Sequence, residues 1–225
     1  MQRYAMPDWV KQRILRRRPT LFAHQYIPAN KSALVVVDMQ NYFCAPGQPN
    51  ETPAAREIVG NINRMAERMR QSGGVVIWVQ TSSARALERW ARHHRHLLSE
   101  ERAAKRIAGL AEGSEGFALY QGLDARRDDL FVKKTTYSAL IRDSSTLEDE
   151  IRRRGIESLL IAGTTTNVCC ESTARDAMLL DYRVVVLSDA TAATTLEEHV
   201  GSLNNIALFF GDVMSVDEAA ERLTA

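Results

Sequence analysis

Short apolar runs alternate with longer amphipathic stretches along most of this chain, and that alternation limits the folds open to it. The runs carry β-branched residues or leucine at consecutive positions, as strands do when both faces of their sheet are buried. Five runs lie at 32–37, 74–79, 129–132, 158–162 and 183–187, with a possible sixth at 212–215. This order predicts a three-layer α/β/α fold around a mainly parallel, Rossmann-like sheet of five or six strands.

The stretches between the runs have apolar residues at helical spacing. Residues 54–72, 145–154, 168–180 and 196–210 each predict a crossover helix with one buried face. Neither an internal repeat nor a low-complexity linker divides the chain, so we predict a single domain over residues 31–225.

Two segments fall outside the alternation. Residues 1–30 hold six basic residues against one acidic residue, and their Arg16–Arg18 run predicts a solvated or subunit-contacting arm more than a nucleic-acid site. Residues 84–117 are rich in Arg, Glu and Ala and predict a helical insertion, either a lid over a pocket or a subunit contact.

Composition excludes several classes of protein. The 225 residues include 29 Lys and Arg against 28 Asp and Glu, so a net charge of +1 argues against a dedicated nucleic-acid binder. The longest apolar runs span about five residues, whereas a membrane helix needs about 20. Three cysteines, an odd and small number, indicate a reducing, cytoplasmic setting, and the N-terminus lacks the pattern of a secretory signal.

Reactive side chains follow three predicted strands, and the carboxyl ends of parallel strands meet at one edge of a sheet. Asp38 follows the first run, Lys133 and Lys134 follow the third, and Cys169 opens the helix after the fourth. A carboxylate can accept a thiol proton, and a nearby lysine favours the thiolate, so the three form a complete set for acyl transfer. Taken singly, Asp38 could equally be a turn or cap residue, a lysine pair after a strand more often faces solvent, and a cysteine in an apolar helix is more often core.

The position of Cys169 in the chain suggests an activated thiol. Thr166 or Asn167 can cap the following helix, which would place Cys169 in the first turn, where backbone N–H groups stabilise a thiolate. We therefore expect an alkylating agent to react with Cys169 below the pH that an ordinary thiol requires.

Three motifs resemble those of the isochorismatase-like cysteine hydrolases. They are VVVDMQNYF at 35–43, KTTYSAL at 134–140 and GTTTNVCCESTARDA at 163–177, and the resemblance covers about residues 31–218. It implies that Asp38 is the acid/base and Cys169 the nucleophile. Lys134, rather than Lys133, matches the lysine because of its spacing to Ser138. Cys170 stands where the family commonly has Val, which implies packing.

The resemblance also implies how the substrate is held. The family has a cis peptide bond that would fall here at Thr164–Thr165, and it would aim the N–H groups of Thr165 and Cys169 at an oxyanion. Asn41, Phe43 and Tyr137 flank the motifs and are candidates to line the pocket, with core packing an equal alternative for the two aromatic residues. Family members are commonly dimers or tetramers, so we expect a homo-oligomer.

Departures from the family pattern narrow the chemistry. Nicotinamidases of the family bind a metal through Asp and His after the aspartate motif, but residues 44–57 contain neither, so we expect no metal and no cofactor. His93, His94 and His96 do not share one helical face, which favours a solvated helix over a metal site.

The intact Asp38, Lys134 and Cys169 set favours hydrolysis of a C–N bond in a small amide or ureide, of ureidoacrylate or N-carbamoyl type. Two alternatives remain: a vinyl-ether hydrolase in which Cys169 is incidental, and a catalytically silent binding protein that uses residues 11–18 to contact a partner.

Overall fold

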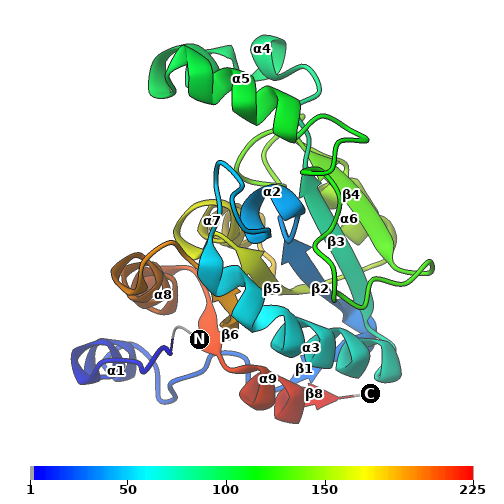
Figure 1. The fold of residues 1–225 in the computed structure, drawn as a ribbon. Coiled ribbons are helices and arrows are strands. Elements are labelled where there is room, and N and C mark those ends of the chain that lie inside the picture. The colour runs from blue at the N-terminus through cyan, green and yellow to red at the C-terminus, as the bar shows by residue number, and fades with distance from the viewer. Residues whose placement is uncertain (1–2, 225) are drawn as a thin grey trace.

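A six-stranded, wholly parallel sheet forms the centre of the molecule, with the strand order β4-β3-β2-β5-β6-β7 (Figure 1). The computed structural model describes residues 3–224. The strands are β2 (Ser32–Val37), β3 (Val75–Thr81), β4 (Leu130–Lys134), β5 (Ser158–Thr164), β6 (Arg183–Ala192) and β7 (Asp212–Met214). The predicted parallel α/β fold is confirmed, and the possible sixth strand is β7.

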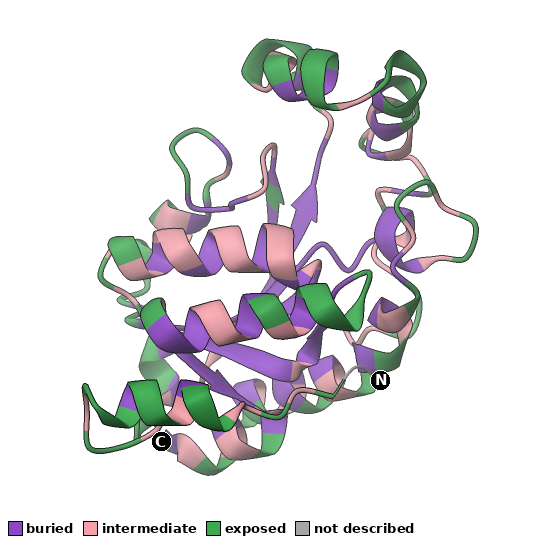
Figure 2. Cartoon of the chain, turned by 90° about the vertical axis from the view of Figure 1, so that its left-hand side faces the viewer, coloured by how far each residue is buried: buried purple, intermediate pink, exposed green. Residues whose placement is uncertain are grey.

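Helices cover both faces of the sheet, so its strands are apolar at consecutive positions. In β2, Leu34 and Val36 face one layer while Ala33, Val35 and Val37 face the other, and all five are buried. The first layer contains α3 (Val59–Gln71) and α9 (Val216–Arg222); the second contains α6 (Leu147–Arg153), α7 (Glu171–Leu179) and α8 (Leu196–Phe209). Figure 2 shows the buried sheet between helices whose outer faces are exposed. This is the predicted three-layer arrangement.

Two predicted crossover helices begin with irregular turns. The stretch at 54–72 consists of a 3₁₀ segment, η2 (Pro53–Ile58), followed by α3. The stretch at 168–180 begins with a π-helical segment, η4 (Thr166–Cys170), followed by α7. Because η4 directly follows β5, it lies at the carboxyl edge of the sheet.

The N-terminal segment packs on the domain at several points between residues 3 and 30. Helix α1 (Asp8–Leu15) lies against α8, and its Val10 and Ile14 are buried. Beyond it, β1 (Ile27–Pro28) pairs in parallel with β8 (Leu223–Thr224), and η1 (Ala29–Lys31) leads into β2. Arg18 forms an ion pair of 2.8 Å with the fully buried carboxylate of Asp212. The expectation of a solvated basic run is therefore wrong for Arg18; residues 1–2 lie outside the described part.

The insertion at 84–117 rises from the carboxyl ends of the strands, at the top of Figure 1. It contains α4 (Ala86–Arg89), the π-helical η3 (His93–Leu97) and α5 (Glu100–Gly109), while the short helix α2 (Asn41–Cys44) follows β2 beneath it. Within residues 3–224, none of the helices combines the length and apolar character needed to cross a membrane.

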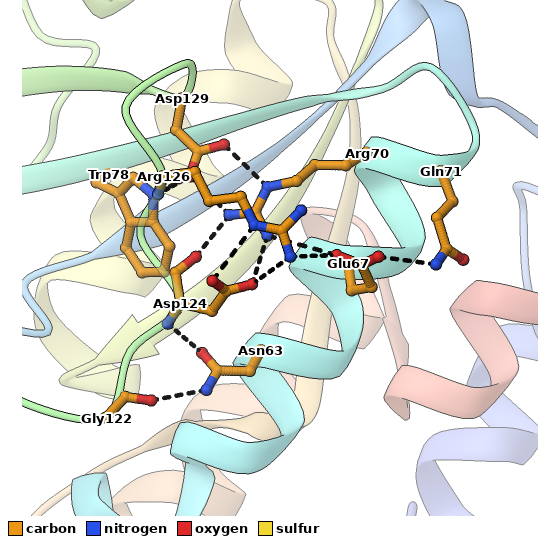
Figure 3. A network of polar contacts seen from close by, with 9 residues as sticks. All are labelled: Asn63, Glu67, Arg70, Gln71, Trp78, Gly122, Asp124, Arg126 and Asp129. Carbon is orange, nitrogen blue, oxygen red and sulfur yellow. Dashed lines mark hydrogen bonds and ion pairs between the residues drawn. The ribbon is translucent and has the colours of Figure 1, made fainter.

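The chain returns from the insertion to β4 through a loop fastened to α3 (Figure 3). Arg70 of α3 donates to both carboxylate oxygens of Asp129, at 3.0 and 2.6 Å, and to Asp124 at 2.9 Å. The indole of Trp78 on β3 donates to the same Asp129 at 2.8 Å. These contacts fix the start of β4 and therefore the position of Lys134 at its end.

Candidate active site

The structure brings Asp38, Lys134 and Cys169 together at the carboxyl edge of the sheet. Lys134 Nζ lies 2.8 Å from Asp38 Oδ2 and 3.5 Å from Cys169 Sγ. The side chains of Asp38 and Lys134 are fully buried, and Cys169 is 6% exposed. Three residues from different strand ends thus form one buried cluster, with the lysine between carboxylate and thiol.

Thr81, which ends β3, completes the cluster and was missed by the sequence analysis. Its hydroxyl accepts a hydrogen bond from Lys134 Nζ at 2.7 Å and donates one to Asp38 Oδ1 at 2.8 Å. The side chain of Gln40 holds the backbone of Thr81 by accepting from its N–H at 2.7 Å and donating to its carbonyl at 3.0 Å. Thr81 is the last residue of β3, but the predicted strand stopped at Val79, two residues short.

Asp38 leaves β2 in an unusual backbone conformation. Its φ is 53°, in the left-handed region that few residues other than glycine adopt. Its N–H donates to the carbonyl of Val79 at 2.8 Å, which ties this turn to the neighbouring strand. The side chain is therefore held by the sheet itself.

Cys169 rests as a thiol in this environment. Burial raises its pKa to about 12, Lys134 opposes the rise, and the charge of Asp38 together with a hydrogen bond from the thiol adds to it. For Lys134, burial favours loss of the proton, but Asp38 and Cys169 outweigh burial and hold its pKa above the usual value. The expectation of a preformed thiolate is wrong: the free protein pairs a neutral thiol with a carboxylate and an ammonium group.

The turn that carries Cys169 also differs from the predicted capped helix. Thr165 is the residue before η4, and no side chain caps the segment. The hydroxyl of Thr166 instead contacts Nδ1 of His199 on α8 at 2.9 Å. The Thr164–Thr165 peptide bond is cis, as the family resemblance implies. Cys170 is fully buried against the sheet, in keeping with the packing role expected of it.

A cavity of about 360 Å³ opens in front of Cys169. Thr165 and Cys169, the two residues expected to provide oxyanion N–H groups, both line it, as do Phe43 and Tyr137. Asn41 does not line it, contrary to expectation, because its amide donates to the carbonyl of Glu115 at 2.9 Å. Asn41 is therefore not among the residues that line the cavity.

Some of the other residues that line the cavity come from the insertion. His93, Arg102 and Arg106 line the cavity, which favours the predicted lid over a pocket, while the other predicted role, a subunit contact, stays a prediction. The sequence favoured a solvated helix for His93, His94 and His96, so none of the three was expected at the cavity. The distance along the chain between the insertion and the strands does not determine where the insertion lies in space. The sequence therefore contained no indication that these side chains line the cavity beside Cys169.

His93 and His94 are buried, so the expectation of a solvated helix is wrong for both. The ring of Trp90 stacks on His93 at 3.8 Å, and His93 Nε2 lies 3.0 Å from the hydroxyl of Tyr137. Burial, together with Arg106 and His94, lowers the pKa of His93 to about 4, so the ring is neutral at pH 7. Among residues 3–224, no three His, Cys, Asp or Glu side chains are grouped so as to hold a metal ion.

Comparison with known proteins identifies the family of this chain. The isochorismatase domain family matches residues 32–218, and the chain belongs to that family. It is 33% identical over 231 residues to the ureidoacrylate amidohydrolase RutB of Variovorax paradoxus (strain S110), covering 95% of this chain and 88% of the relative. It is 36% identical over 174 residues to a probable inactive nicotinamidase of Arabidopsis thaliana, covering 76% and 86%.

Solved structures show the same fold. A cysteine hydrolase from Pseudomonas syringae pv. phaseolicola 1448A superimposes with a TM-score of 0.77 at 28% identity, covering 87% of this chain and 93% of that one. N-carbamoylsarcosine amidase from Thermoplasma acidophilum gives a TM-score of 0.64 at 26% identity, covering 83% and 97%.

Proposed function

We propose that this protein is a cysteine-dependent amidohydrolase that cleaves a C–N bond in a small amide or ureide. The observation that carries the proposal is the buried cluster at the cavity wall, where Lys134 lies 2.8 Å from Asp38 and 3.5 Å from Cys169. A nucleophile, a proton acceptor and a fixed positive charge are the groups that acyl transfer requires.

The first half of the reaction forms an acyl-enzyme. Asp38 takes the proton from Cys169 Sγ as sulfur attacks the substrate carbonyl carbon, and the N–H groups of Thr165 and Cys169 bind the resulting oxyanion. When the C–N bond breaks, Asp38 returns the proton to the departing nitrogen. Because the resting thiol has a raised pKa, proton transfer accompanies attack instead of preceding it.

The second half releases the acyl group. Asp38 takes a proton from water, the water oxygen attacks the thioester carbonyl, and the carbon–sulfur bond breaks as Asp38 returns that proton to Cys169 Sγ, which regenerates the thiol. Lys134 stays charged throughout and stabilises Asp38 as a carboxylate whenever the proton is on sulfur or substrate. No cofactor enters either step.

For the substrate we propose a ureide of ureidoacrylate type or an N-carbamoyl compound. One relative is named a ureidoacrylate amidohydrolase and one solved structure an N-carbamoylsarcosine amidase, and both names support that class. The chemistry of the Asp38, Lys134 and Cys169 cluster supports it as well. A cavity of about 360 Å³ suits a small molecule.

We also propose the cellular compartment and the oligomeric state of the protein. A reducing cytoplasm would preserve the three free cysteines that the mechanism and core need as thiols. We further propose a homo-oligomer, dimer or tetramer, with neither nucleic acid nor membrane as partner. Exposed apolar side chains at Leu97, Phe131 and Ile141 offer contact surface for such an assembly, which light scattering coupled to size-exclusion chromatography would measure.

An ammonia-release screen across ureido acids, N-carbamoyl amino acids and simple amides tests the activity. Turnover of at least one class should be abolished by Cys169→Ser and kept by Cys170→Ser, since only the first sulfur faces the cavity. Equal losses in both variants, or none in either, would refute the assignment. Turnover of isochorismate alone, insensitive to Cys169→Ser, would instead support vinyl-ether hydrolysis, and no turnover of any compound would support a silent protein.

A further inference from the structure

Arg106 of the insertion is a buried cation with no anionic partner. It is 8% exposed and lines the cavity together with Cys169. Within residues 3–224, no side chain or carbonyl accepts a hydrogen bond from its guanidinium, whereas Arg70, with a side chain 15% exposed, pairs with both Asp124 and Asp129. Its guanidinium nitrogens keep contact with solvent, so their free N–H donors are available to a ligand in the cavity, and planar carboxylates match their geometry.

Aromatic contacts fix the position of Arg106 relative to the catalytic cluster. Its guanidinium carbon lies 5.9 Å from the centre of the Trp90 ring, which stacks on His93 at 3.8 Å. His93 in turn contacts the Tyr137 hydroxyl at 3.0 Å, three residues after Lys134 in the chain. The guanidinium is thus positioned through a chain of contacts that ends at the catalytic motif.

The two acidic side chains that line the same cavity already accept hydrogen bonds from other groups of the protein. Glu51 accepts hydrogen bonds from Arg56 and from the N–H of Gly47, both at 2.8 Å. Glu198 accepts from the N–H of Thr195 at 2.9 Å, as part of a helix capping box.

A second cation lies one helical turn before Arg106 on α5. Arg102 is exposed at the cavity rim and, like Arg106, has no side-chain partner among residues 3–224. The catalytic cluster adds no net charge, because the ammonium of Lys134 balances the carboxylate of Asp38 beside a neutral thiol. Glu51 is paired with Arg56, which leaves the charge of Glu198 against those of Arg102 and Arg106, so the insertion gives the cavity an excess of one positive charge.

We propose that Arg106 binds a carboxylate of the substrate, with Arg102 attracting it at the rim, so that the insertion selects anionic amides or ureides. This inference rests on the proposed amidohydrolase function and adds the residues that determine its specificity. In this arrangement the substrate carbonyl that is attacked lies at Cys169, and the carboxylate of the same substrate molecule pairs with the guanidinium of Arg106.

Binding to a variant that cannot turn over separates this inference from catalysis. In a Cys169→Ala background, titration calorimetry would compare N-carbamoyl-β-alanine with its uncharged primary amide. We expect the acid to bind more tightly, and Arg106→Gln to weaken the acid by about 10- to 100-fold while leaving the amide within about twofold. Arg106→Lys should keep part of the preference because it retains charge without the two-pronged geometry.

Arg95→Gln is the matched control, because it removes an exposed arginine of the same insertion that does not line the cavity. Its affinities should equal those of the background. Equal binding of acid and amide, binding of neither, or equal losses for both in Arg106→Gln would overturn the inference. If Arg106-dependent binding of the acid persists but the enzyme with Cys169 intact hydrolyses no C–N compound, the proposed function fails and the anion site stands.

Discussion

At the scale of single residues, proton placement determines how the site works. Cys169 shares its surroundings with a carboxylate and an ammonium group, and burial keeps the sulfur protonated until a substrate arrives. A thiolate waiting in an open cavity would be exposed to oxidants and stray electrophiles. A thiol that ionises only as it attacks avoids that exposure.

The raised pKa of Cys169 predicts slow alkylation in the free protein. With a pKa of about 12, far above the ordinary 9.0, the thiolate fraction at pH 7 is small, so iodoacetamide should modify Cys169 more slowly than free cysteine. Peptide mass spectrometry would assign the label. A rate at Cys169 exceeding that of free cysteine at pH 7 would show that the site holds a thiolate.

The sequence identified catalytic candidates where strand ends revealed them, and missed those that depend on distance in space. Asp38, Lys134 and Cys169 each follow an apolar run, so the parallel sheet alone brings them to one edge. Thr81 was not predicted because the strand expected before it ended two residues too early, at Val79. Arg106 escaped because its helix reaches the cavity through the insertion, whose placement depends on aromatic contacts with Tyr137 rather than on any period in the chain.

At the scale of elements, β5 and β2 meet so closely before the nucleophile turn that only glycine fits. Gly163 has a φ of +112°, and a Cβ there would lie 2.0 Å from the carbonyl oxygen of Val37. Asp38 follows β2 and Cys169 follows β5 beyond this point, so the spacing of the two strands sets the distance between these residues.

Gly163→Ala should therefore destabilise the fold by at least about 3 kcal/mol, from the clash and the disfavoured backbone together. Gly60→Ala, in the exposed part of α3 with nothing within 4 Å, should instead stabilise the protein by about 0.5 to 1 kcal/mol. Chemical denaturation measures both. A Gly163→Ala protein as stable as the wild type would contradict the close approach of β2 and β5.

The docking of the insertion should depend on pH through His93. Its pKa is about 4 in the folded protein against an ordinary 6.5, so the released insertion binds a proton that the docked one does not. The contribution of His93 is fully present above pH 6.5 and is lost as pH falls toward 4. Tryptophan fluorescence, through Trp90, should change over that window in the wild type.

His93→Gln should remove the part of the fluorescence change on acidification that arises from protonation of this imidazole ring. His96→Gln is the control, because His96 is exposed on the same element. If the His93→Gln transition has the wild-type midpoint and amplitude, the neutral ring does not hold the insertion in place.

Element boundaries were predictable in the sheet and less so at its margins. Continuous apolar runs marked β2 at its observed bounds, 32–37, and placed the starts of β3 to β7 within one residue. The packing of α1 on α8 left little trace in the sequence, because only Val10 and Ile14 of that helix are buried. Two contacts among charged neighbours do not produce a visible period, so the segment was expected to be an arm.

At the scale of the whole molecule, the account requires no metal ion. Lys134 supplies the fixed positive charge beside the nucleophile, and residues 44–57 lack the His and Asp ligands of metal-dependent family members. Exhaustive dialysis against EDTA should leave kcat within about twofold. Lost activity that returns on addition of Zn²⁺ or another divalent ion would refute this.

Acylation of Cys169 distinguishes the proposed reaction from its alternatives, and rapid quenching of a turnover reaction followed by peptide mass spectrometry can detect it. The account predicts that the peptide containing Cys169 gains the mass of the substrate acyl group during turnover, that the Cys170→Ser protein does the same, and that Cys169→Ser neither gains it nor turns over. Hydrolysis at the wild-type rate by Cys169→Ser, or an acyl group found on Cys44 or Cys170 instead, would contradict the account.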